Sequence, residues 1–480
     1  MLLKRLSEKM KILLIKAYSG RKYCDIVPPM GLMYLASYAR SKINDIDIRI
    51  FDARLKGSRK ENVLNEMIEK YGPDMVGISA SSEDSQGMHS IARAVKSFDR
   101  KISVVAGGAH PSSYADDVVE DANIDIAVIG EGELTFYEII EYALGRRGID
   151  DIDGIVFRRE GNTFRSRPRA YIEDLDSLPF PSWDLIDVEA YSRTNIIMMN
   201  PIMKGRLYMG MITSRGCPYN CVYCHDILGK VFRKRSAANV VAEIGALVDN
   251  YGVDEIHIYD DIFNFDGYRV DNICDMIVEY NLKVNIAFPN GIRGDIIEKK
   301  TLVNMKRAGV YMVTFALESA SPRIQRFIKK DIDIVSLREN IIFSDSIGLI
   351  TNCFFMLGFP GESYSELRET IRFALSSPLI FAAFFIVTPQ KNTKLYDMAK
   401  EIFPGIEQEF DHSSYYYGKS RYYEKCCSKP LKLIQSYAFI RFYLDPARML
   451  RLYRKVPRKE FLFNTNLLKF IKVITDSVLA

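Results

Sequence analysis

The sequence predicts an α/β protein in which a Rossmann-like domain is followed by a partial (β/α)6 barrel and a mainly helical C-terminal region. Three observations support this prediction. Short continuous runs of Ile and Val alternate with amphipathic segments from Lys11 onward, and the same alternation resumes at Leu207 after a proline-marked segment. Continuous apolar runs are typical of parallel strands that are buried on both faces of a sheet. A loop with three closely spaced cysteines directly follows the first apolar run of the second region.

Length and composition are those of a soluble protein with more than one domain. At 480 residues the chain exceeds one ordinary core, and its 48% hydrophobic and 26% charged content is typical of globular proteins. The formal net charge of +4 is small for this length and by itself says nothing about nucleic acid. No nucleic-acid partner is expected. Eight cysteines in so long a chain do not suggest a disulfide framework, and three clustered thiols suit a reducing cytoplasm.

The sequence also excludes two kinds of membrane segment. The first ten residues lack the apolar core of a signal peptide. No apolar run reaches the roughly 18 residues that a membrane-spanning helix needs. We therefore expect a cytoplasmic protein that is soluble or at most peripheral to a membrane.

Residues 1–150 are expected to form the Rossmann-like domain, because strand-like and helix-like segments alternate there. The expected strands are Ile12 to Ala17, Ile46 to Phe51, Met75 to Ala80, Ile102 to Ala106 and Ile124 to Ile129. The helical patterns between them include Gly31 to Ser41, Arg59 to Tyr71 and Gln86 to Phe98.

Three loops at the carboxyl ends of these strands are distinctive, since ligands of such sheets bind outside that edge. They contain Ser79 and Ser81; Gly107, Gly108 and His110; and Gly130, Glu131, Gly132 and Glu133. Glycine lets a bulky ligand approach the backbone. No G-x-G-x-x-G follows the first strand, so a dinucleotide is not expected. From the residues alone, these loops could equally be tight strand-to-helix turns.

Residues 151–200 are expected to hold a β-hairpin and a linker between domains. The hairpin spans Gly154 to Tyr171 with its turn at Glu160 to Asn162. The linker, Asp174 to Trp183, is acidic and carries two prolines that favour an extended path.

Residues 201–400 repeat the strand–helix alternation six times, which predicts a partial barrel with its chemistry at the carboxyl strand ends. The expected strands are Leu207 to Ile212, Glu255 to Tyr259, Val284 to Phe288, Met312 to Leu317, Asn352 to Leu357 and Phe381 to Val387. Helical patterns include Ala237 to Tyr251, Asp295 to Ala308 and Glu366 to Leu375.

The three cysteines after the first of these strands are Cys217, Cys221 and Cys224, in a C-x3-C-x2-C run. Thiolates are soft ligands that suit iron–sulfur clusters and zinc. A closed zinc site takes four ligands, whereas a [4Fe–4S] cluster with three cysteines leaves one iron open to a substrate or cofactor. Zinc completed by His225 and three incidental thiols are the alternatives.

This cysteine run resembles that of the radical S-adenosylmethionine (SAM) enzymes, and the whole segment from Lys11 to Met398 resembles the cobalamin-binding members of that family. The resemblance implies three cofactors: a [4Fe–4S] cluster, SAM and cobalamin. It implies reductive cleavage of SAM to a 5′-deoxyadenosyl radical that functionalises an unactivated carbon, most often by C-methylation. A cobalamin-using oxidoreductase or cyclase is the alternative enzyme, and a cobalamin-responsive sensor is the non-enzyme alternative. A tRNA methylthiotransferase fits poorly, because only Cys24 precedes the motif.

The resemblance also implies which residues bind SAM. Tyr223 would lie near the adenine, Asp260 and Asp261 near the ammonium group, and Arg293 would clamp a carboxylate. The candidates from later turns are Glu318 and Ser319 of Glu-Ser-Ala-Ser, and Gly358 of Gly-Phe-Pro-Gly-Glu. Loop packing is the alternative role for Tyr223, solvated acids for the aspartates, and a surface ion pair for Arg293. The segment from Thr388 to Thr393 departs from the family's pattern.

In the first domain the resemblance assigns cobalamin to the three loops already described, at Ser79, Ser81, Gly107, Gly108, His110, Gly130, Glu131, Gly132 and Glu133. The Asp-x-His-x-x-Gly motif that supplies a histidine to cobalt in methionine-synthase-like domains is absent. We therefore expect cobalamin to bind without a histidine ligand of that type.

Residues 401–480 change in character. Tyr415 to Tyr417 and the pair Cys426 and Cys427 form an aromatic, thiol-containing segment, and Leu431 to Leu452 and Asn466 to Leu479 are amphipathic and basic. Such helices either cap the barrel or lie on an anionic membrane. The expected partners are a small-molecule or lipid-like substrate and an electron donor such as flavodoxin or ferredoxin.

Overall fold

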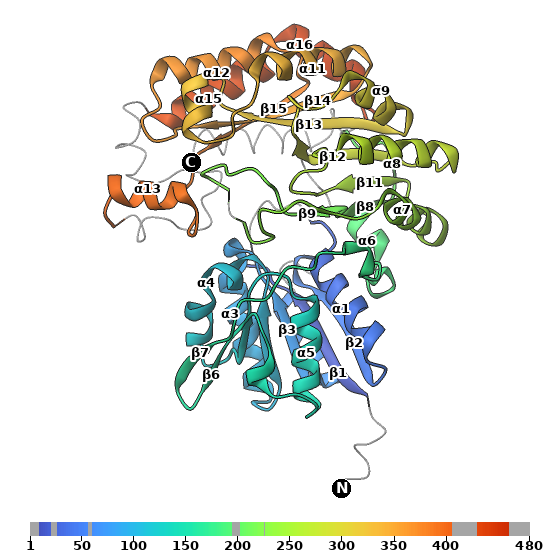
Figure 1. The fold of residues 1–480 in the computed structure, drawn as a ribbon, viewed down its shortest axis with the longest axis vertical. Coiled ribbons are helices and arrows are strands. Elements are labelled where there is room, and N and C mark those ends of the chain that lie inside the picture. Colours follow the sequence, from blue (N-terminus) through green and yellow to red (C-terminus); the bar gives the residue numbers. More distant parts are fainter. Residues whose placement is uncertain are drawn as a thin grey trace. The chain divides into compact units, whose positions relative to one another are not determined.

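The computed structural model describes residues 9–20, 26–55, 60–193, 202–224, 226–405 and 430–459. The chain divides into two compact units, Met1–Thr194 and Asn195–Ala480 (Figure 1). The predicted Cys426 and Cys427, Tyr415 to Tyr417, Cys24, His225 and the stretch from Asn466 to Leu479 lie outside the described residues.

The first unit is built on one seven-stranded sheet with the order β2-β1-β3-β4-β5-β6-β7. Its strands are β1 (Met10–Lys16), β2 (Ile46–Asp52), β3 (Met75–Ser79), β4 (Ser103–Gly107), β5 (Ile126–Val128), β6 (Ile155–Arg159) and β7 (Asn162–Arg165). Its helices are α1 (Met30–Lys42), α2 (Lys60–Tyr71), α3 (Ser85–Phe98), α4 (Ala109–Glu120), α5 (Glu133–Ala143) and α6 (Val188–Arg193).

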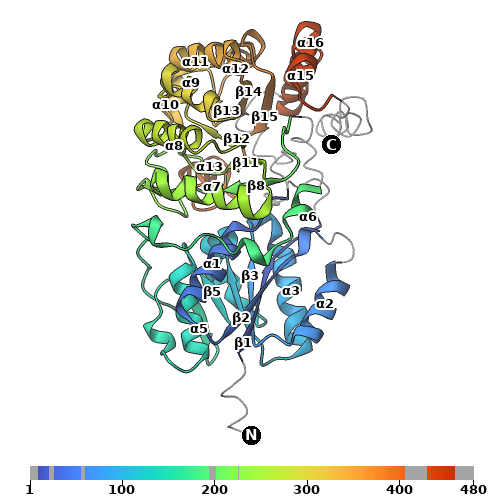
Figure 2. The same cartoon turned by 90° about the vertical axis from the view of Figure 1, so that its right-hand side faces the viewer.

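Helices cover both faces of this sheet, as the continuous apolar strands predict. One core cluster joins the sheet to α2, α3 and α4 through residues such as Leu64, Met88 and Val118. A second cluster joins the other face to α1 and α5 through Leu32 and Phe136. Figure 2 shows α1 and α5 on one side of the strands and α2 and α3 on the other. The predicted doubly wound Rossmann-like domain is confirmed.

The predicted hairpin belongs to this same sheet. Strand β6 pairs antiparallel with β5 and with β7, and the turn uses Glu160 and Gly161 at positive φ. The predicted linker also packs on this unit, because Ser182 N–H donates to the Met33 carbonyl and Arg40 pairs with Asp184.

The second unit contains a six-stranded parallel sheet with the order β15-β14-β13-β12-β11-β8. Its strands are β8 (Tyr208–Met211), β11 (Glu255–Ile258), β12 (Asn285–Ile292), β13 (Val310–Glu318), β14 (Ile350–Leu357) and β15 (Phe381–Ile386). Its helices are α7 (Ala237–Tyr251), α8 (Gly267–Glu279), α9 (Lys299–Arg307), α10 (Pro322–Phe327), α11 (Ile334–Ser346) and α12 (Tyr364–Ser376). Each of these strands pairs in parallel with the next one along the chain, which confirms the predicted partial barrel.

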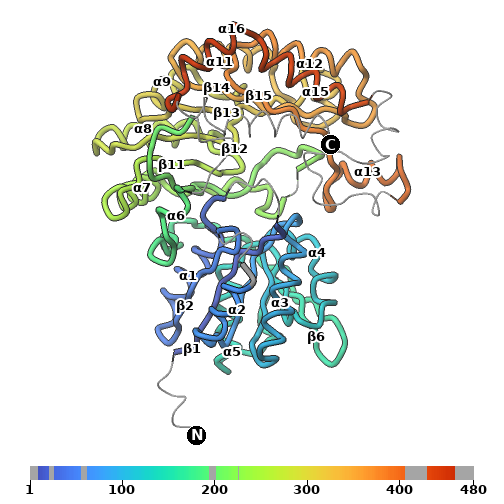
Figure 3. Tube along the Cα trace, turned by 180° about the vertical axis from the view of Figure 1, so that it is seen from behind, coloured from blue at the N-terminus to red at the C-terminus, as the bar shows by residue number. Residues whose placement is uncertain are grey.

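Local signals explain where these helices begin. Helix α7 starts after Ser236, whose side chain accepts from Asn239 N–H, and it ends at Gly252 in the left-handed region. Helix α12 starts with a capping box formed by Ser363 and Glu366. Helices α9, α11 and α12 lie along one face of the sheet (Figure 3), so that the carboxyl ends of the strands are left to the loops.

The described part of the C-terminal region is helical: α13 (Lys394–Ile402), α15 (Leu431–Tyr443) and α16 (Pro446–Lys455). Gln435 Nε2 donates to the Phe384 carbonyl, and Tyr443 Oη pairs with the Ala382 backbone, which fixes α15 on β15. Within the described ranges, no helix combines the length and hydrophobicity of a membrane-spanning segment.

Candidate functional site

The cysteine loop lies directly beyond the carboxyl end of β8. A two-stranded ribbon, β9 (Ser214–Arg215) with β10 (Arg233–Lys234), joins the two ends of the loop. Gly216 adopts φ +79°, and a Cβ there would lie 2.4 Å from the Val231 carbonyl oxygen, so glycine is required. Cys217 N–H donates to the Gly229 carbonyl at 3.3 Å. The sequence did not indicate this ribbon, which is too short to carry a pattern.

The three thiols are neighbours. The Cys224 thiol donates a hydrogen bond to Cys221, which lowers the pKa of Cys221 and raises that of Cys224. Burial raises the pKa of Cys217, and the charge of Cys221 raises it further. Among the residues that the structure describes, no three Cys, His, Asp or Glu side chains are arranged as ligands of a metal ion. The donor set, three thiols within eight residues with one already inclined to ionise, fits a thiolate-held iron–sulfur cluster.

A cluster of polar groups closes one side of the loop. Lys330 Nζ lies 3.0 Å from Glu318 Oε1 and 3.1 Å from Tyr223 Oη. Its side chain is 11% exposed. Burial alone would lower the pKa of Lys330, but the carboxylate of Glu318 and the thiol of Cys221 raise it above its ordinary value. The predicted Tyr223 and Glu318 are thus brought together.

Lys330 is a candidate site residue that the sequence analysis missed. The dipeptide Lys329-Lys330 follows a short helix and is indistinguishable by pattern from an exposed charge pair. The structure, and not the sequence, marks the position: Lys329 and Asp331, on either side of Lys330, have φ +53° and +48°. Such angles are unusual for side chains with a Cβ and often mark functional turns.

Glu318 itself ends β13 in an unusual conformation. Its φ is +67°, and the register of β13 with β14 shifts between Ala316 and Glu318. The irregularity turns the carboxylate toward Lys330. The predicted Ser319 lies fully buried behind it, where its Oγ contacts Thr370 Oγ1 at 3.3 Å and accepts from Ser321 N–H.

The two predicted aspartates at the end of β11 have different environments. Asp260 is 2% exposed, and its carboxylate accepts from Thr213 N–H, Thr213 Oγ1 and Ser214 Oγ at 2.5–2.7 Å. Asp260 therefore fixes the end of β8 just before the cysteine loop. Asp261 is exposed, and its Oδ2 accepts from Gly216 N–H at 3.2 Å. The assignment of both residues to the SAM ammonium group stays a prediction.

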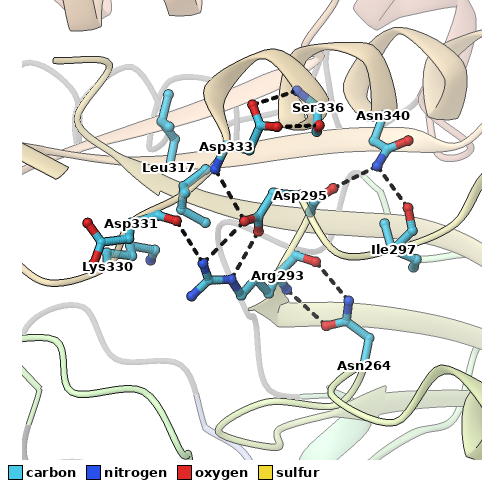
Figure 4. Close-up of polar contacts among 12 residues, drawn as sticks. Asn264, Arg293, Asp295, Ile297, Leu317, Lys330, Asp331, Asp333, Ser336 and Asn340 are labelled. Atoms are coloured by element: carbon cyan, nitrogen blue, oxygen red, sulfur yellow. Dashed lines mark hydrogen bonds and ion pairs between the residues drawn. The ribbon is translucent and has the colours of Figure 1, made fainter. Parts of the chain in front are cut away.

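Arg293 follows β12, and Figure 4 shows its side chain directed at Asp295 and Asp331. Its guanidinium bonds the Asp295 carboxylate through Nε at 3.0 Å and Nη2 at 3.2 Å, and Nη2 also donates to the Asp331 carbonyl at 3.1 Å. The guanidinium carbon lies 3.8 Å from the ring centroid of Tyr219. These partners differ from the carboxylate clamp that the sequence suggested, which stays a prediction.

The predicted Gly358 sits in a tightly packed turn. It has φ +94°, and a Cβ would lie 2.3 Å from Leu431 Cδ1 of α15. The N–H groups of Gly358 and Phe359 both donate to Glu362 Oε2, at 2.7 and 3.1 Å. Burial raises the pKa of Glu362 to about 7, although the two N–H donors act in the opposite direction.

One face of the last two strands is apolar and half-buried. It is formed by alternate residues of neighbouring strands in register, namely Asn352, Phe354 and Met356 of β14 with Phe381, Ala383 and Phe385 of β15. The opposite face packs under helices, as where Phe384 contacts Phe439 and Phe442 of α15. The half-buried face is the one turned away from those helices.

The three loops of the first unit lie side by side at the carboxyl edge of its sheet. Gly108 has φ +96°, and a Cβ there would lie 2.9 Å from the Ala80 carbonyl oxygen and 3.0 Å from Ser79 Oγ. Ser112 Oγ connects the next two loops, since it donates to the Gly108 carbonyl and accepts from Gly130 N–H. Among the described residues, a Cβ at Gly130 would meet no atom within 4 Å, and a Cβ at Gly107 would meet only Val128. The backbone there is accessible to a large ligand.

The other predicted cobalamin residues are mostly engaged within the protein. Ser81 Oγ donates to Asp84, and His110 is stacked on Tyr114 with centroids 4.7 Å apart. Glu131 accepts from Ile172 N–H of the linker. A Cβ at Gly132 would meet Leu35, and Glu133 is 4% exposed at the start of α5. These nine assignments stay predictions, and the structure brings them to one edge.

Comparisons with known families match both units. The B12 binding domain matches residues 20–140, and the Radical SAM superfamily matches residues 211–374. The two matches cover the sheet-edge loops of the first unit, and in the second unit the cysteine loop with the parallel strands from the end of β8 to β14.

Individual relatives agree with these matches. The chain is 32% identical over 375 residues to an uncharacterized methyltransferase, PH0819, from Pyrococcus horikoshii, and the match covers 78% of each chain. It is 27% identical over 412 residues to cytidylyl-2-hydroxyethylphosphonate methyltransferase from Streptomyces wedmorensis, covering 76% of this chain and 77% of the relative. The anaerobic magnesium-protoporphyrin IX monomethyl ester cyclase of Rubrivivax gelatinosus is 24% identical over 375 residues, covering 77% of this chain and 66% of the cyclase.

A solved structure shares the fold. The radical S-adenosylmethionine methyltransferase TsrM from Kitasatospora setae superimposes with a TM-score of 0.68 at 17% identity, covering 82% of this chain and 77% of that one. At 17% identity the superposition shows a shared fold and no more, and it supports the two-domain α/β architecture.

Glu362 predicts how stability varies with pH. The pKa of Glu362 is raised to about 7 in the folded state. The stabilisation from this group is therefore complete at pH values below its pKa in the unfolded chain, and it is lost as the pH rises through 7. Glu362→Gln keeps an acceptor for the two N–H donors and removes the titration. Between pH 5 and 8 the free energy of unfolding of the wild type should therefore fall by up to about 3 kcal/mol relative to that of the variant. Urea unfolding at several pH values measures this, with Glu369→Gln on the exposed side of α12 as control, and parallel curves for wild type and Glu362→Gln would refute it.

Proposed function

Because this chain belongs to the cobalamin-binding radical S-adenosylmethionine family, we propose that it methylates an unactivated carbon of a small-molecule or lipid-like substrate. The observation that carries this proposal is the three-thiol loop at the carboxyl end of β8, closed by Lys330, Glu318 and Tyr223. The loop and Glu318 come from strand ends of one parallel sheet, where barrel enzymes carry their chemistry, and Lys330 comes from the turn after α10.

The cofactors would supply the chemistry, and the residues of this chain would position them. When bound, a [4Fe–4S] cluster with SAM supplies a 5′-deoxyadenosyl radical, and cobalamin supplies a methyl group. Cys217, Cys221 and Cys224 are the thiolates that would hold the cluster. Lys330 would hold Glu318 and Tyr223 in place where SAM binds at the cluster, because its buried ammonium group is already bonded to both. Glu318 would accept from the hydroxyl or ammonium groups of the same cofactor.

The alternative within the family is a cyclase or oxidoreductase that uses cobalamin without transferring methyl. The similarity to magnesium-protoporphyrin ester cyclases keeps this alternative open. The higher identity to proteins named methyltransferases, over more of their length, favours methylation.

An assay of SAM products distinguishes the two. After anaerobic reconstitution with iron, sulfide and hydroxocobalamin, the protein should convert methyl-labelled SAM to 5′-deoxyadenosine together with S-adenosylhomocysteine. Deoxyadenosine alone would favour the cyclase. Cys217→Ala should abolish both products, because the cluster loses a thiolate, whereas Cys274→Ala in the buried core of α8 should retain them. Full activity of Cys217→Ala would refute the proposal.

The half-buried apolar face of β14 and β15 supports an apolar substrate. It presents Phe354, Met356 and Phe381 on the side of the sheet opposite to the helices. Apolar side chains that stay accessible inside an enzyme domain are typical of ligand sites.

Phe354→Ala should therefore raise the KM for substrate about tenfold, given about 1.5–3 kcal/mol for burying one large apolar side chain. SAM cleavage should continue, so the ratio of deoxyadenosine to product should rise. Tyr268→Ala, at a 78% exposed position on α8, is the control. An unchanged KM and an unchanged ratio would show that the substrate binds elsewhere.

A reducing partner and a membrane are the other proposed contacts. The cluster needs an electron, for which flavodoxin or ferredoxin is the expected type of donor. We also propose that the described C-terminal helices rest on an anionic membrane surface. In α15 the residues Leu433, Tyr437, Ile440 and Leu444 recur at helical spacing, and their side chains are 45–67% exposed.

The charge of this segment supports a bilayer as the occupant. Residues 430–459 contain eight basic residues and one acidic residue, whereas the whole chain has a net charge of +4. Four of the eight, Arg448, Arg451, Lys455 and Arg458, also bond to other parts of the second unit. Met449 and Leu450 of α16 add 51% and 49% exposed apolar side chains. A basic segment with exposed apolar residues complements anionic lipid and would repel a second copy of itself.

Vesicle co-sedimentation tests this contact. The full-length protein should bind phosphatidylglycerol-containing vesicles more than phosphatidylcholine vesicles, and salt should weaken the binding. Leu433→Gln with Leu444→Gln should reduce binding about tenfold or more, because two apolar side chains no longer insert. Val335→Gln, at a 69% exposed position on α11, should not. Absence of vesicle binding, or loss of dimers instead of vesicle binding in the double variant, would overturn the membrane contact.

A further inference from the structure

Two tyrosines lie inside the cysteine motif, one in each interval between cysteines, and each contacts a cation. Tyr223, in the second interval, has its hydroxyl 3.1 Å from Lys330 Nζ. Tyr219, in the first interval, has its ring 3.8 Å from the guanidinium carbon of Arg293. The second distance is well inside the range in which a cation is attracted to an aromatic ring.

The protein holds the guanidinium of Arg293 in place before any cofactor binds. Asn264 fixes the backbone, since its Oδ1 accepts from Arg293 N–H at 2.9 Å and its Nδ2 donates to the Arg293 carbonyl at 2.8 Å. Asp295 and the Asp331 carbonyl take three further hydrogen bonds from the side chain, as Figure 4 shows. The planar fork of arginine makes these contacts in its plane and leaves its face for the ring.

Little of this arrangement is exposed to solvent. The side chains of Arg293 and Asp295 are 11% and 6% exposed. Asp295 also accepts from Asp333 N–H at the start of α11, so its position is fixed from two elements. Since these hydrogen bonds already compensate the charge of Arg293, its guanidinium is poorly disposed to clamp a cofactor carboxylate.

We propose that Arg293 is a positioning residue that acts through Tyr219, holding the first interval of the motif in the geometry that a [4Fe–4S] cluster needs. This inference rests on the proposed function, because it concerns the cluster that the function requires. The same turn, residues 329–331, serves both intervals: its Lys330 contacts Tyr223, and its Asp331 carbonyl holds Arg293.

Two properties of the reconstituted holoenzyme test the inference without an assay of activity: the reduction potential of the cluster and the Kd for SAM. The variants are Arg293→Gln, Tyr219→Leu and the two combined. We expect each single variant to shift the potential, and the combined variant to shift it no further than the larger single shift, because both changes break one contact. The Kd for SAM should stay within about threefold of wild type. If Arg293 clamped the carboxylate of SAM, its loss would raise the Kd far more.

Two controls separate this role from general damage. Tyr219→Phe keeps the ring and should retain the wild-type potential. Arg338→Gln removes a guanidinium–ring contact of similar length, 4.2 Å to Phe373, elsewhere in the same unit, and should also leave the potential unchanged. The iron content and melting temperature of each variant identify those that fail to fold. If Arg293→Gln or Tyr219→Leu fails to fold, the potential of Arg293→Lys, which lacks the planar guanidinium, is compared with that of Tyr219→Phe, and only Arg293→Lys should be shifted.

Four outcomes would overturn the inference. Additive shifts in the combined variant would show that Arg293 does not act through Tyr219. A large loss of SAM affinity in Arg293→Gln alone would restore the carboxylate clamp. If wild-type protein assembles a normal cluster and all variants match it, the inference fails while the proposed function stands; if wild-type protein assembles no cluster, both fail.

Discussion

The structure of the second unit depends on one buried cation. The ammonium group of Lys330 bonds to the Glu318 carboxylate and the Tyr223 hydroxyl, and it interacts electrostatically with the thiols of Cys221 and Cys224. It thus connects the end of β13, the turn after α10 and the cysteine loop. Breaking a buried ion pair by removing one partner commonly costs about 3–5 kcal/mol, because the remaining charge is left uncompensated. That cost explains why three chain segments so far apart in sequence share one arrangement. It also explains the positive φ angles at Glu318, Lys329 and Asp331, which the surrounding contacts maintain.

The regular elements could be predicted from the sequence because their signals are local. All eleven expected strands are present, most within two residues of the expected bounds, because continuous Ile and Val runs identify buried parallel strands. Strand β12 continues past Phe288 to Ile292, where a bulge rather than an apolar pattern carries it on. The hairpin was expected, but not that β6 would pair with β5 and extend the first sheet, because pairing between distant segments leaves no mark on either one.

The candidate site shows the same division more sharply. Cysteine spacing and the strand-end turns placed the thiols, Glu318 and Gly358 correctly at one edge of a sheet. Lys330 escaped notice because its neighbour Lys329 makes the pair resemble an exposed surface. The clamp suggested for Arg293 rested on its place after a strand, whereas the structure shows a guanidinium already bound by Asp295 two residues later. Side-chain partners decide such roles, and a sequence read alone does not supply them.

The contact between Gly358 and Leu431 has a consequence for any shortened form of this protein. The absence of a side chain at position 358 makes room for the first residue of α15, 73 positions further along the chain. A protein trimmed after β15 would retain the three cysteines of the motif and the strand-end turns up to Gly358, yet an apolar notch would open beside the Gly-Phe-Pro-Gly-Glu turn. The C-terminal helices are therefore part of the wall of the barrel, and the smallest unit worth crystallising includes them.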